Sequence, residues 1–303
     1  MTAAGALERR DHPMPIHETR EHPQGSAADP VGLDRVTFDH VAIAVRHPTD
    51  PWPIFADVLG GRYLDRGVNP GFGWTQLRFA NGFVLEGLNP EPSDRDDFLN
   101  RFLDRNGPGP HHLTFKVPDL DRMLDRVRAA GFDPVGEDRT DPTWYEAFLH
   151  PAQAHGIVVQ LAQVGPDPHA PAPEPEGFPE LTFDHPMASL GRVVHAVADL
   201  DGAVSLFRDV LGGRVMSSGA AIDGNHWVEL GWNGPGRLRL LEGVHAEIAE
   251  WIGDRPGRLR HLFFSFDEPR TVPGVREVAE NRWVLDADDV LGTRLVLSSN
   301  ARP

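Results

Sequence analysis

Apolar and polar positions alternate along short segments of this chain, and Gly and Pro separate those segments. The run "HVAIAV" at 40–45 places every second side chain on the same face, which predicts a β-strand. The segment at 50–61 has two prolines near its start and two glycines at its end, which favours a short helix. The segments at 73–80 and 82–88 read as strands, and Asn81-Gly82 between them is typical of a hairpin turn. The predicted order of elements is therefore βαβββ.

A second unit of the same kind follows. The segment "HHLTFKV" at 111–117 predicts a strand, and apolar residues recur at helical spacing through 119–132. The segments "TWYEAFLHP" at 143–151 and "GIVVQLA" at 156–162 complete a second βαβββ module.

The two modules have counterparts further along the chain. "FADVLGGR" at 55–62 returns as "FRDVLGGR" at 207–214, and "RVVHAV" at 192–197 matches the first strand with the same offset of 152 residues. The repeat predicts four modules in two halves. A four-stranded curved sheet leaves one face uncovered, so we expect modules one and two to pair, and three and four, with a cleft inside each pair. A swapped pairing within a homodimer stays open.

Two segments lack the apolar period that a core requires. Residues 1–34 mix charge, Pro, Gly and Ala and are expected to form a disordered arm, and the Pro-rich acidic segment 164–180 predicts an extended linker. The predicted layout is an arm at 1–34, a metal-bearing domain at 35–163, a linker at 164–180 and a degenerate domain at 181–303.

Composition narrows the chemistry that this chain can perform. There is no cysteine, so a metal site must use His, Asp, Glu, Gln or water. A formal charge of −16 argues against nucleic acid and anionic membranes as partners, because such surfaces need clustered Lys and Arg. The chain shows no apolar run of about 20 residues and no signal-peptide pattern at its start, so we expect a cytoplasmic protein. A small molecule is the expected substrate.

These features resemble the vicinal oxygen chelate superfamily, which includes glyoxalase I, methylmalonyl-CoA epimerase, extradiol dioxygenases and antibiotic-binding proteins. The likeness rests on the paired modules, the histidines at the first strands, the "F-x-D-V-L-G-G" helix end and "FLHPAQAHGIVVQLAQ" at 148–163; it covers about 36–163 and, more weakly, 187–299. It implies an α+β fold of four βαβββ modules paired into two curved-sheet domains. It also implies one divalent metal ion (Fe, Co, Mn, Ni or Zn) in the first cleft, held by His40, Glu86, His112 and Gln160.

The alternation of side chains agrees with this mapping. His40 shares its strand face with two alanines, which leave room in a cleft, and His112 shares its face with Thr114. His111 is expected to point the other way and to pack or hydrogen-bond at the turn. Two imidazoles, a carboxylate and an amide oxygen suit an open five- or six-coordinate site. Each of these residues also has a purely structural interpretation, which stays open.

The second half departs from the pattern. The equivalent positions are Arg192, Glu242, His261 and Val296. A guanidinium offers no lone pair to a metal, so we expect a metal-free half that serves as scaffold, dimer surface or an anion-tolerant pocket around Arg192.

The implied ligand set contains the same groups as the one that the resemblance implies for methylmalonyl-CoA epimerase, with the two modules exchanged. In that class a carboxylate on the third strand of the Gln-bearing module assists proton transfer. Glu146 stands at that position here, and Gln76 stands at the matching position of the other module. The expected activity is therefore proton transfer next to a carbonyl group through an enolate, as in an epimerase, isomerase or lyase, with Glu146 as the catalytic base. A solvent-facing strand residue is the equal alternative for Glu146.

Two other functions stay open. His40, His112 and Glu86 alone form the two-histidine, one-carboxylate set of non-haem Fe(II) oxygenases, as in extradiol dioxygenases. A metal-free binding protein of the antibiotic-resistance type would instead line its cleft with aromatic side chains, for which the candidates are Trp52, Phe72, Trp74, Trp144 and Tyr145.

Overall fold

The computed structural model describes residues 32–92, 97–166, 168, 170–174, 178–179, 186–220, 224–244 and 246–299. Nearly all of the predicted arm at 1–34 and part of the predicted linker at 164–180 lie outside the described residues.

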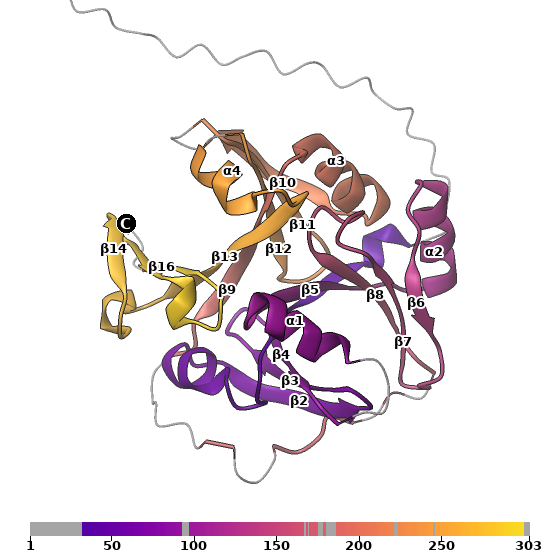
Figure 1. Cartoon of the computed structure of the whole chain (residues 1–303), viewed down its shortest axis with the longest axis horizontal. Helices are drawn as coiled ribbons and strands as arrows, with labels where there is room; N and C mark the ends of the chain where they lie inside the picture. The colour runs from indigo at the N-terminus through magenta and orange to yellow at the C-terminus, as the bar shows by residue number, and fades with distance from the viewer. Residues whose placement is uncertain are drawn as a thin grey trace, which may run out of the picture.

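Modules one and two form one eight-stranded sheet (Figure 1). Its strands are β1 (Thr37–Ala44), β2 (Arg62–Asn69), β3 (Phe72–Arg78), β4 (Val84–Pro90), β5 (Gly109–Lys116), β6 (Val135–Asp138), β7 (Trp144–Leu149) and β8 (Val158–Val164). Their spatial order is β2-β3-β4-β1-β5-β8-β7-β6. The first strands of the two modules, β1 and β5, pair antiparallel at the centre, and each pairs parallel with the last strand of its own module. The predicted pairing of these modules is confirmed.

Modules three and four repeat this arrangement in a second eight-stranded sheet. Its strands are β9 (Ser189–Val197), β10 (Arg214–Ala220), β11 (His226–Gly231), β12 (Arg237–Glu242), β13 (Gly257–Phe266), β14 (Arg276–Ala279), β15 (Arg282–Leu285) and β16 (Leu295–Ser299). Their order, β10-β11-β12-β9-β13-β16-β15-β14, matches that of the first sheet strand for strand. The predicted α+β fold of paired modules is therefore confirmed.

Short helices connect the strands. They are η1 (Leu33–Arg35), η2 (Trp52–Val58), α1 (Phe98–Asn106), α2 (Leu120–Ala129), α3 (Leu200–Val204), η3 (Ser205–Val210), α4 (Ala246–Ile252), η4 (Pro269–Thr271) and η5 (Ala287–Asp289). The crossover of module four is reduced to the single turn η4, because prolines at 269 and 273 do not permit a longer helix there. No helix in the described ranges is both long and apolar enough to cross a lipid bilayer.

One apolar core joins the two sheets. Phe79 of the first half lies 5.0 Å from Phe264 of the second, and Phe115 lies 4.9 Å from Trp232, measured between ring centroids. The buried cluster that contains these rings includes residues from both halves. The core uses one face of each sheet, and the other face carries the polar residues described below.

The helix α1, which the sequence analysis did not predict, covers part of that second face (Figure 1). The Asp97 side chain accepts a hydrogen bond from Asn100 N at its start, and Gly107 with φ 70° ends it. Leu99 and Leu103, one helical turn apart, are buried against Ala44 of β1. The helix therefore closes one end of the sheet face that carries His40.

Candidate metal centre

Three polar side chains converge on the concave face of the first sheet. His40 on β1, Glu86 on β4 and His112 on β5 are all buried, and their donor atoms lie within 4.8 Å of one another. His40 Nε2 lies 3.5 Å from Glu86 Oε2, and His112 Nε2 lies 3.6 Å from Glu86 Oε1. Two imidazole nitrogens thus face the two oxygens of one carboxylate.

Strand register produces this convergence. Ala42 of β1 pairs with Glu86 on one side and with His112 on the other. Because Ala42 carries only a methyl group, the two longer side chains meet above it. His40 lies two residues earlier on the same face, as the alternation predicts.

The donors fit a divalent cation. His112 Nε2 is buried and has no hydrogen-bond partner within the described part of the chain, although a buried ring nitrogen normally has one. Burial lowers the pKa of His112 well below its usual range, and the neighbouring His111 and His40 lower it further. His112 is therefore neutral at pH 7, the form in which imidazole binds a metal.

His40 has the opposite electrostatic environment. Burial disfavours its charged form, but Glu86 and Asp39 outweigh burial and raise the pKa of His40 to about 9. Without a cation, His40 carries the positive charge that balances the buried Glu86. A divalent ion bound between the same groups would replace that charge.

The fourth predicted ligand, Gln160, lies beside this cluster. Thr114 Oγ1 donates to Gln160 Oε1 at 2.5 Å and lies 2.9 Å from His40 Nε2. Gln160 Nε2 donates in turn to Glu146 Oε2 at 2.6 Å. The structure thus brings three predicted ligands into direct convergence and links Gln160 to His40 through Thr114.

The predicted base Glu146 lies on β7, where Trp144 Nε1 also donates to its Oε2 at 3.1 Å. Burial raises the pKa of Glu146, although both hydrogen bonds oppose the shift. On the other side of the centre, Gln76 Nε2 donates to Glu86 Oε2 at 2.9 Å. Each module therefore contributes one amide–carboxylate pair, Gln76 with Glu86 and Gln160 with Glu146. The carboxylate is on the last strand in the first module and on the third strand in the second, as the sequence predicts.

Two β-bulges supply contacts that the sequence analysis missed. The pairing of β1 with β5 skips Asp39 and His111, so each is an extra residue beside a candidate ligand. Asp39 Oδ2 lies 2.9 Å from His40 Nδ1, and His111 Nδ1 lies 3.0 Å from His112 Nδ1. The expectation that His111 points away from His112 is wrong, because the bulge interrupts strict alternation.

Asp39 is itself held in place by Lys116, whose Nζ lies 2.9 Å from Oδ1. Burial would raise the pKa of Asp39, but His40 and Lys116 outweigh burial and lower it to about 2. A charged carboxylate therefore accepts the Nδ1 hydrogen of His40 and directs Nε2 toward Glu86.

The predicted aromatic lining is only partly on this face. Phe72 and Trp74 pack with α1, and Trp144 contacts Glu146. Trp52 and Tyr145 instead pack with the core on the opposite side of the sheet, which makes their assignment to the cleft wrong.

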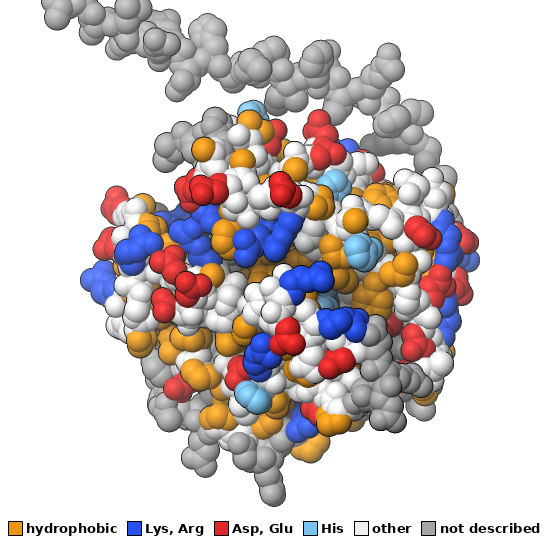
Figure 2. All heavy atoms as spheres, viewed as in Figure 1, with side chains coloured by type: hydrophobic (Ala, Val, Ile, Leu, Met, Phe, Trp, Pro, Cys, Tyr) orange, Lys and Arg blue, Asp and Glu red, His pale blue; other side chains and the backbone are white. Residues whose placement is uncertain are grey.

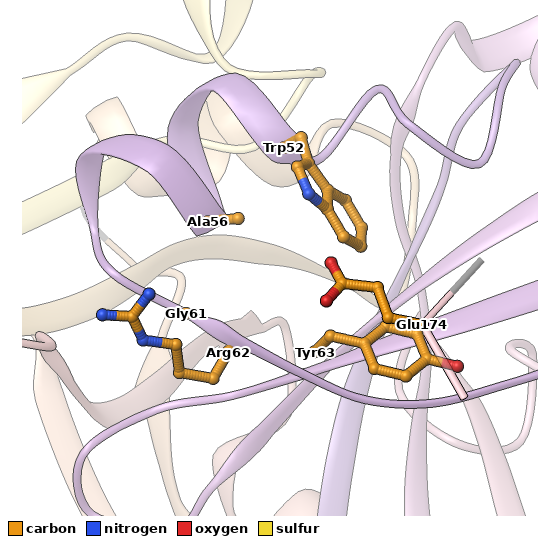
Figure 3. Close-up of a pocket in the computed structure, with 6 residues that line it drawn as sticks. All are labelled: Trp52, Ala56, Gly61, Arg62, Tyr63 and Glu174. Atoms are coloured by element: carbon orange, nitrogen blue, oxygen red, sulfur yellow. The ribbon is translucent and has the colours of Figure 1, made fainter. Parts of the chain in front are cut away.

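Trp52 also borders a cavity of about 290 Å³ together with Tyr63 and Glu174 (Figure 3). The lining of this cavity contains none of the candidate ligands. Pro51, which precedes Trp52, lies close to Gly87, next to Glu86 in sequence and therefore on the other face of β4. The cavity is thus separate from the candidate metal centre.

One of the counterparts predicted for the second half, that of Glu86, differs in the structure. Val194 is the counterpart of Ala42, and it pairs with Arg239 of β12 and His261 of β13. The counterpart of Glu86 is therefore Arg239, and the assignment of Glu242 is wrong.

Paired βαβββ modules with a buried His-Glu-His group on the concave sheet face define a protein of the vicinal oxygen chelate superfamily. The family model described as the glyoxalase-like domain matches residues 38–210, more than half of the chain. This chain therefore belongs to the glyoxalase-like domain family, and the resemblance drawn from the sequence is confirmed.

Individual proteins are similar to this chain, and the likeness to the first of them shows the fold. A mutant of 4-hydroxymandelate synthase from Streptomyces coelicolor matches 88% of this chain and 94% of its own with a TM-score of 0.57 and 15% identity. A methylmalonyl-CoA epimerase from Mycobacterium tuberculosis matches 42% of this chain and 87% of its own, with 28% identity and a TM-score of 0.38. The uncharacterized protein YqjC of Bacillus subtilis (strain 168) is 27% identical over 140 residues, which are 44% of this chain and 95% of that protein.

Proposed function

We propose that this protein is a divalent-metal-dependent enzyme that transfers a proton next to a carbonyl group of a small, oxygen-chelating substrate. The observation that carries the proposal is the unpartnered Nε2 of His112, which faces Glu86 beside the Nε2 of His40. These three residues and Gln160 would hold the ion, and the donor set suits Fe, Co, Mn, Ni or Zn. When bound, such an ion supplies a Lewis acid that stabilises negative charge on a substrate oxygen.

Glu146 is the proposed base. Both of its hydrogen bonds end on Oε2, which leaves Oε1 to accept the substrate proton. In this step the C–H bond next to the carbonyl breaks, the proton moves to Oε1, and the electron pair moves to the carbonyl oxygen to give an enolate. Return of the proton completes an epimerisation or isomerisation. The raised pKa of Glu146 makes its carboxylate a stronger base than an ordinary glutamate.

A non-haem Fe(II) oxygenase is the second candidate. It is favoured by one observation: the three directly converging groups are two histidines and one carboxylate, whereas Gln160 is hydrogen-bonded to Thr114 and Glu146. This candidate predicts iron in the purified protein and oxygen consumption with substrate.

Elemental analysis tests both enzyme candidates. The protein should be purified without chelator and without a histidine tag, and about one transition-metal ion per chain is expected. Iron accompanied by oxygen uptake would favour the oxygenase, and another ion without oxygen uptake would favour proton transfer. Absence of metal, even after reconstitution with each candidate ion, would contradict both enzymes and leave a metal-free binding protein.

Metal binding near pH 7 is expected to release about one proton per ion. His40, with a pKa of about 9, must lose its proton before Nε2 can bind a metal, whereas His112 is already neutral. Among the described residues, the groups that face His40 are Asp39, Glu86, Thr114 and the ring of His112. Below pH 9 the apparent affinity should therefore weaken by about tenfold for each unit that the pH falls.

Calorimetric titration of the metal-free protein with Zn²⁺ measures this number in buffers that differ in ionisation enthalpy. Release of two protons would show that His112 is also charged in the metal-free protein. Release of none would contradict the assignment of His40 as a ligand.

Replacing Asp39 by asparagine is expected to weaken metal binding by about 10- to 100-fold, because the variant loses the charged acceptor that orients His40. Competition with a chromogenic chelator for Co²⁺ measures the affinity. Asp121→Asn on α2 is the matched control, since Asp121 is exposed and contacts Arg139 instead. Equal affinities for the two variants would show that Asp39 does not position His40.

A further inference from the structure

In the second half, the positions that correspond to the candidate metal centre carry mostly positively charged side chains. The central strands pair in the same register in both sheets, β1 with β5 and β9 with β13, and both pairs contain the same two bulges. Every position of the first centre therefore has a defined counterpart in the second half. His112 keeps an imidazole, His261, but Gln160 is replaced by Val296. Four other positions carry arginine: Arg192 stands for His40, Arg239 for Glu86, Arg260 for His111 and Arg282 for Glu146.

The carboxylate of Glu229 lies between Arg192 and Arg239. Arg192 donates to Glu229 Oε2 at 3.0 Å, and Arg239 donates to the same oxygen through Nε at 3.1 Å and a terminal nitrogen at 2.9 Å. Glu229 is the counterpart of Gln76. One carboxylate oxygen therefore faces two cations, and within the described residues Glu229 occupies only one N–H group of Arg192 and two of Arg239.

Aromatic rings hold the guanidiniums in place. The guanidinium carbon of Arg239 lies 3.9 Å from the ring centroid of Trp227, and those of Arg192 and Arg282 lie 4.4 Å and 5.2 Å from the centroid of Phe263. A cation–π contact favours a guanidinium positioned over the ring, so these contacts restrain the donors before a ligand arrives. The side chains of Arg192 and Arg239 are 25% and 24% exposed, which shields their charges and still leaves them accessible.

The positive charge extends beyond these residues. Arg260 forms an ion pair with Glu247, an exposed residue of α4. Arg294 Nε is buried and has no hydrogen-bond partner within the described residues. Burial lowers the pKa of Arg239, and the nearby Arg192 and Arg282 oppose its charge as well. Figure 2 shows Lys and Arg side chains gathered beside α4 on the face viewed. Such a concentration contrasts with the net charge of −16 of the whole chain.

We propose that the face of the second sheet that carries Arg192, Arg239 and Arg282 binds a small oxyanion between these three arginines. The oxyanion has at least two negative charges, as in a phosphate or a dicarboxylate. Planar guanidiniums match the oxygen spacing of both groups, and a dianion would satisfy the donors that Glu229 leaves free. The neighbouring Phe263 and Val296 supply an apolar wall. This site does not depend on a metal in the first half.

Calorimetric titration of the full chain with inorganic phosphate and, separately, with malonate tests the proposal and distinguishes the two sources of the charge. At least one of the two is expected to bind, and added NaCl should weaken that binding. Arg239→Gln should weaken it by about 10-fold or more. The matched control is Arg276→Gln, because Arg276 is exposed and pairs with Asp286 elsewhere. Unchanged binding in His112→Ala would place the anion in the second half.

A change at Glu229 separates ligand binding from a structural role. Glu229→Gln removes the competing internal anion and is expected to tighten phosphate or malonate binding by about 10-fold. A purely structural Arg-Glu-Arg cluster predicts lower thermal stability in Glu229→Gln and no anion binding. Lack of binding of both anions at millimolar concentration, or equal binding by Arg239→Gln and Arg276→Gln, would overturn the proposal.

Discussion

Replacing His112 by alanine is expected to reduce the metal content of the purified protein from about one ion per chain to nearly none. The variant loses the only buried imidazole of the cluster whose Nε2 has no hydrogen-bond partner among the described residues. It also leaves Glu86 facing a single histidine. Loss of an orienting contact alone weakens metal binding by about 10- to 100-fold, so loss of a ligand should exceed that range. Elemental analysis and Co²⁺ titration measure the change.

His47→Ala is the matched control, because His47 is exposed and follows β1 outside the cluster. Its metal content should equal that of the unchanged protein. Thermal unfolding monitored without metal identifies any loss of fold, since removal of a buried ring leaves a cavity. A folded His112→Ala protein that retains a full metal complement would contradict the proposed centre.

Much of the fold could be predicted because the sequence repeats its own pattern. The alternation around His40 defines one strand face, and the duplicated "F-x-D-V-L-G-G" segment sets the order of the modules. The modules of each pair join edge to edge, through β1 and β5 in the first half and through β9 and β13 in the second, and the apolar faces left uncovered pack between the two halves. The convergence of His40 and His112 depends on the strand faces they occupy, which period two predicts, and on the register of β1 with β5, which it does not.

The remaining contacts depend on single-residue irregularities that a pattern does not reveal. The bulges at Asp39 and His111 each add one residue to one strand and leave the period on both sides unchanged. Similarly, the offset of 152 residues would align Glu86 with Leu238, but the observed partner position is Arg239, one residue later. An added residue between β9 and β12 causes this shift. Glu242, three residues after Arg239, is a carboxylate like Glu86 but does not occupy the position that corresponds to Glu86.

The two halves of this fold carry polar clusters of different charge at equivalent strand positions. In both sheets the residue at one position of the first central strand, Ala42 or Val194, pairs with a polar residue on each side, which brings those side chains together. Because backbone pairing fixes those positions, exchange of side chains accounts for the difference between the cluster in which His40 balances Glu86 and the arginine-rich cluster around Arg239. Under the two proposals, the architecture determines where a ligand would bind, and the side chains determine which charge it would carry.

Replacing Glu146 by glutamine is expected to slow proton exchange by about 100- to 10,000-fold while metal content stays unchanged. The amide cannot accept the substrate proton, yet it can still contact Gln160 and Trp144. Deuterium incorporation from D₂O at carbon 2 of methylmalonyl-CoA, read by mass spectrometry, is the first assay, followed by other 2-substituted malonyl thioesters and 2-oxo acids. Because the pKa of Glu146 is raised above its usual 4.5 by burial, the unchanged enzyme should lose activity on acidification at a pH above 4.5.

The control for this variant is Glu277→Gln on β14, which changes the same charge at an exposed position of the other half. Its exchange rate should match that of the unchanged protein. Equal rates in Glu146→Gln and Glu277→Gln would assign the proton transfer to another group and leave Glu146 as the residue that positions Gln160. Loss of metal together with activity in Glu146→Gln would favour the same positioning role. Catalysis by the Glu146 carboxylate predicts a Glu146→Gln protein that keeps its metal and is inactive. A residue that only positions Gln160 would not be needed for proton transfer once Gln160 and the metal are in place.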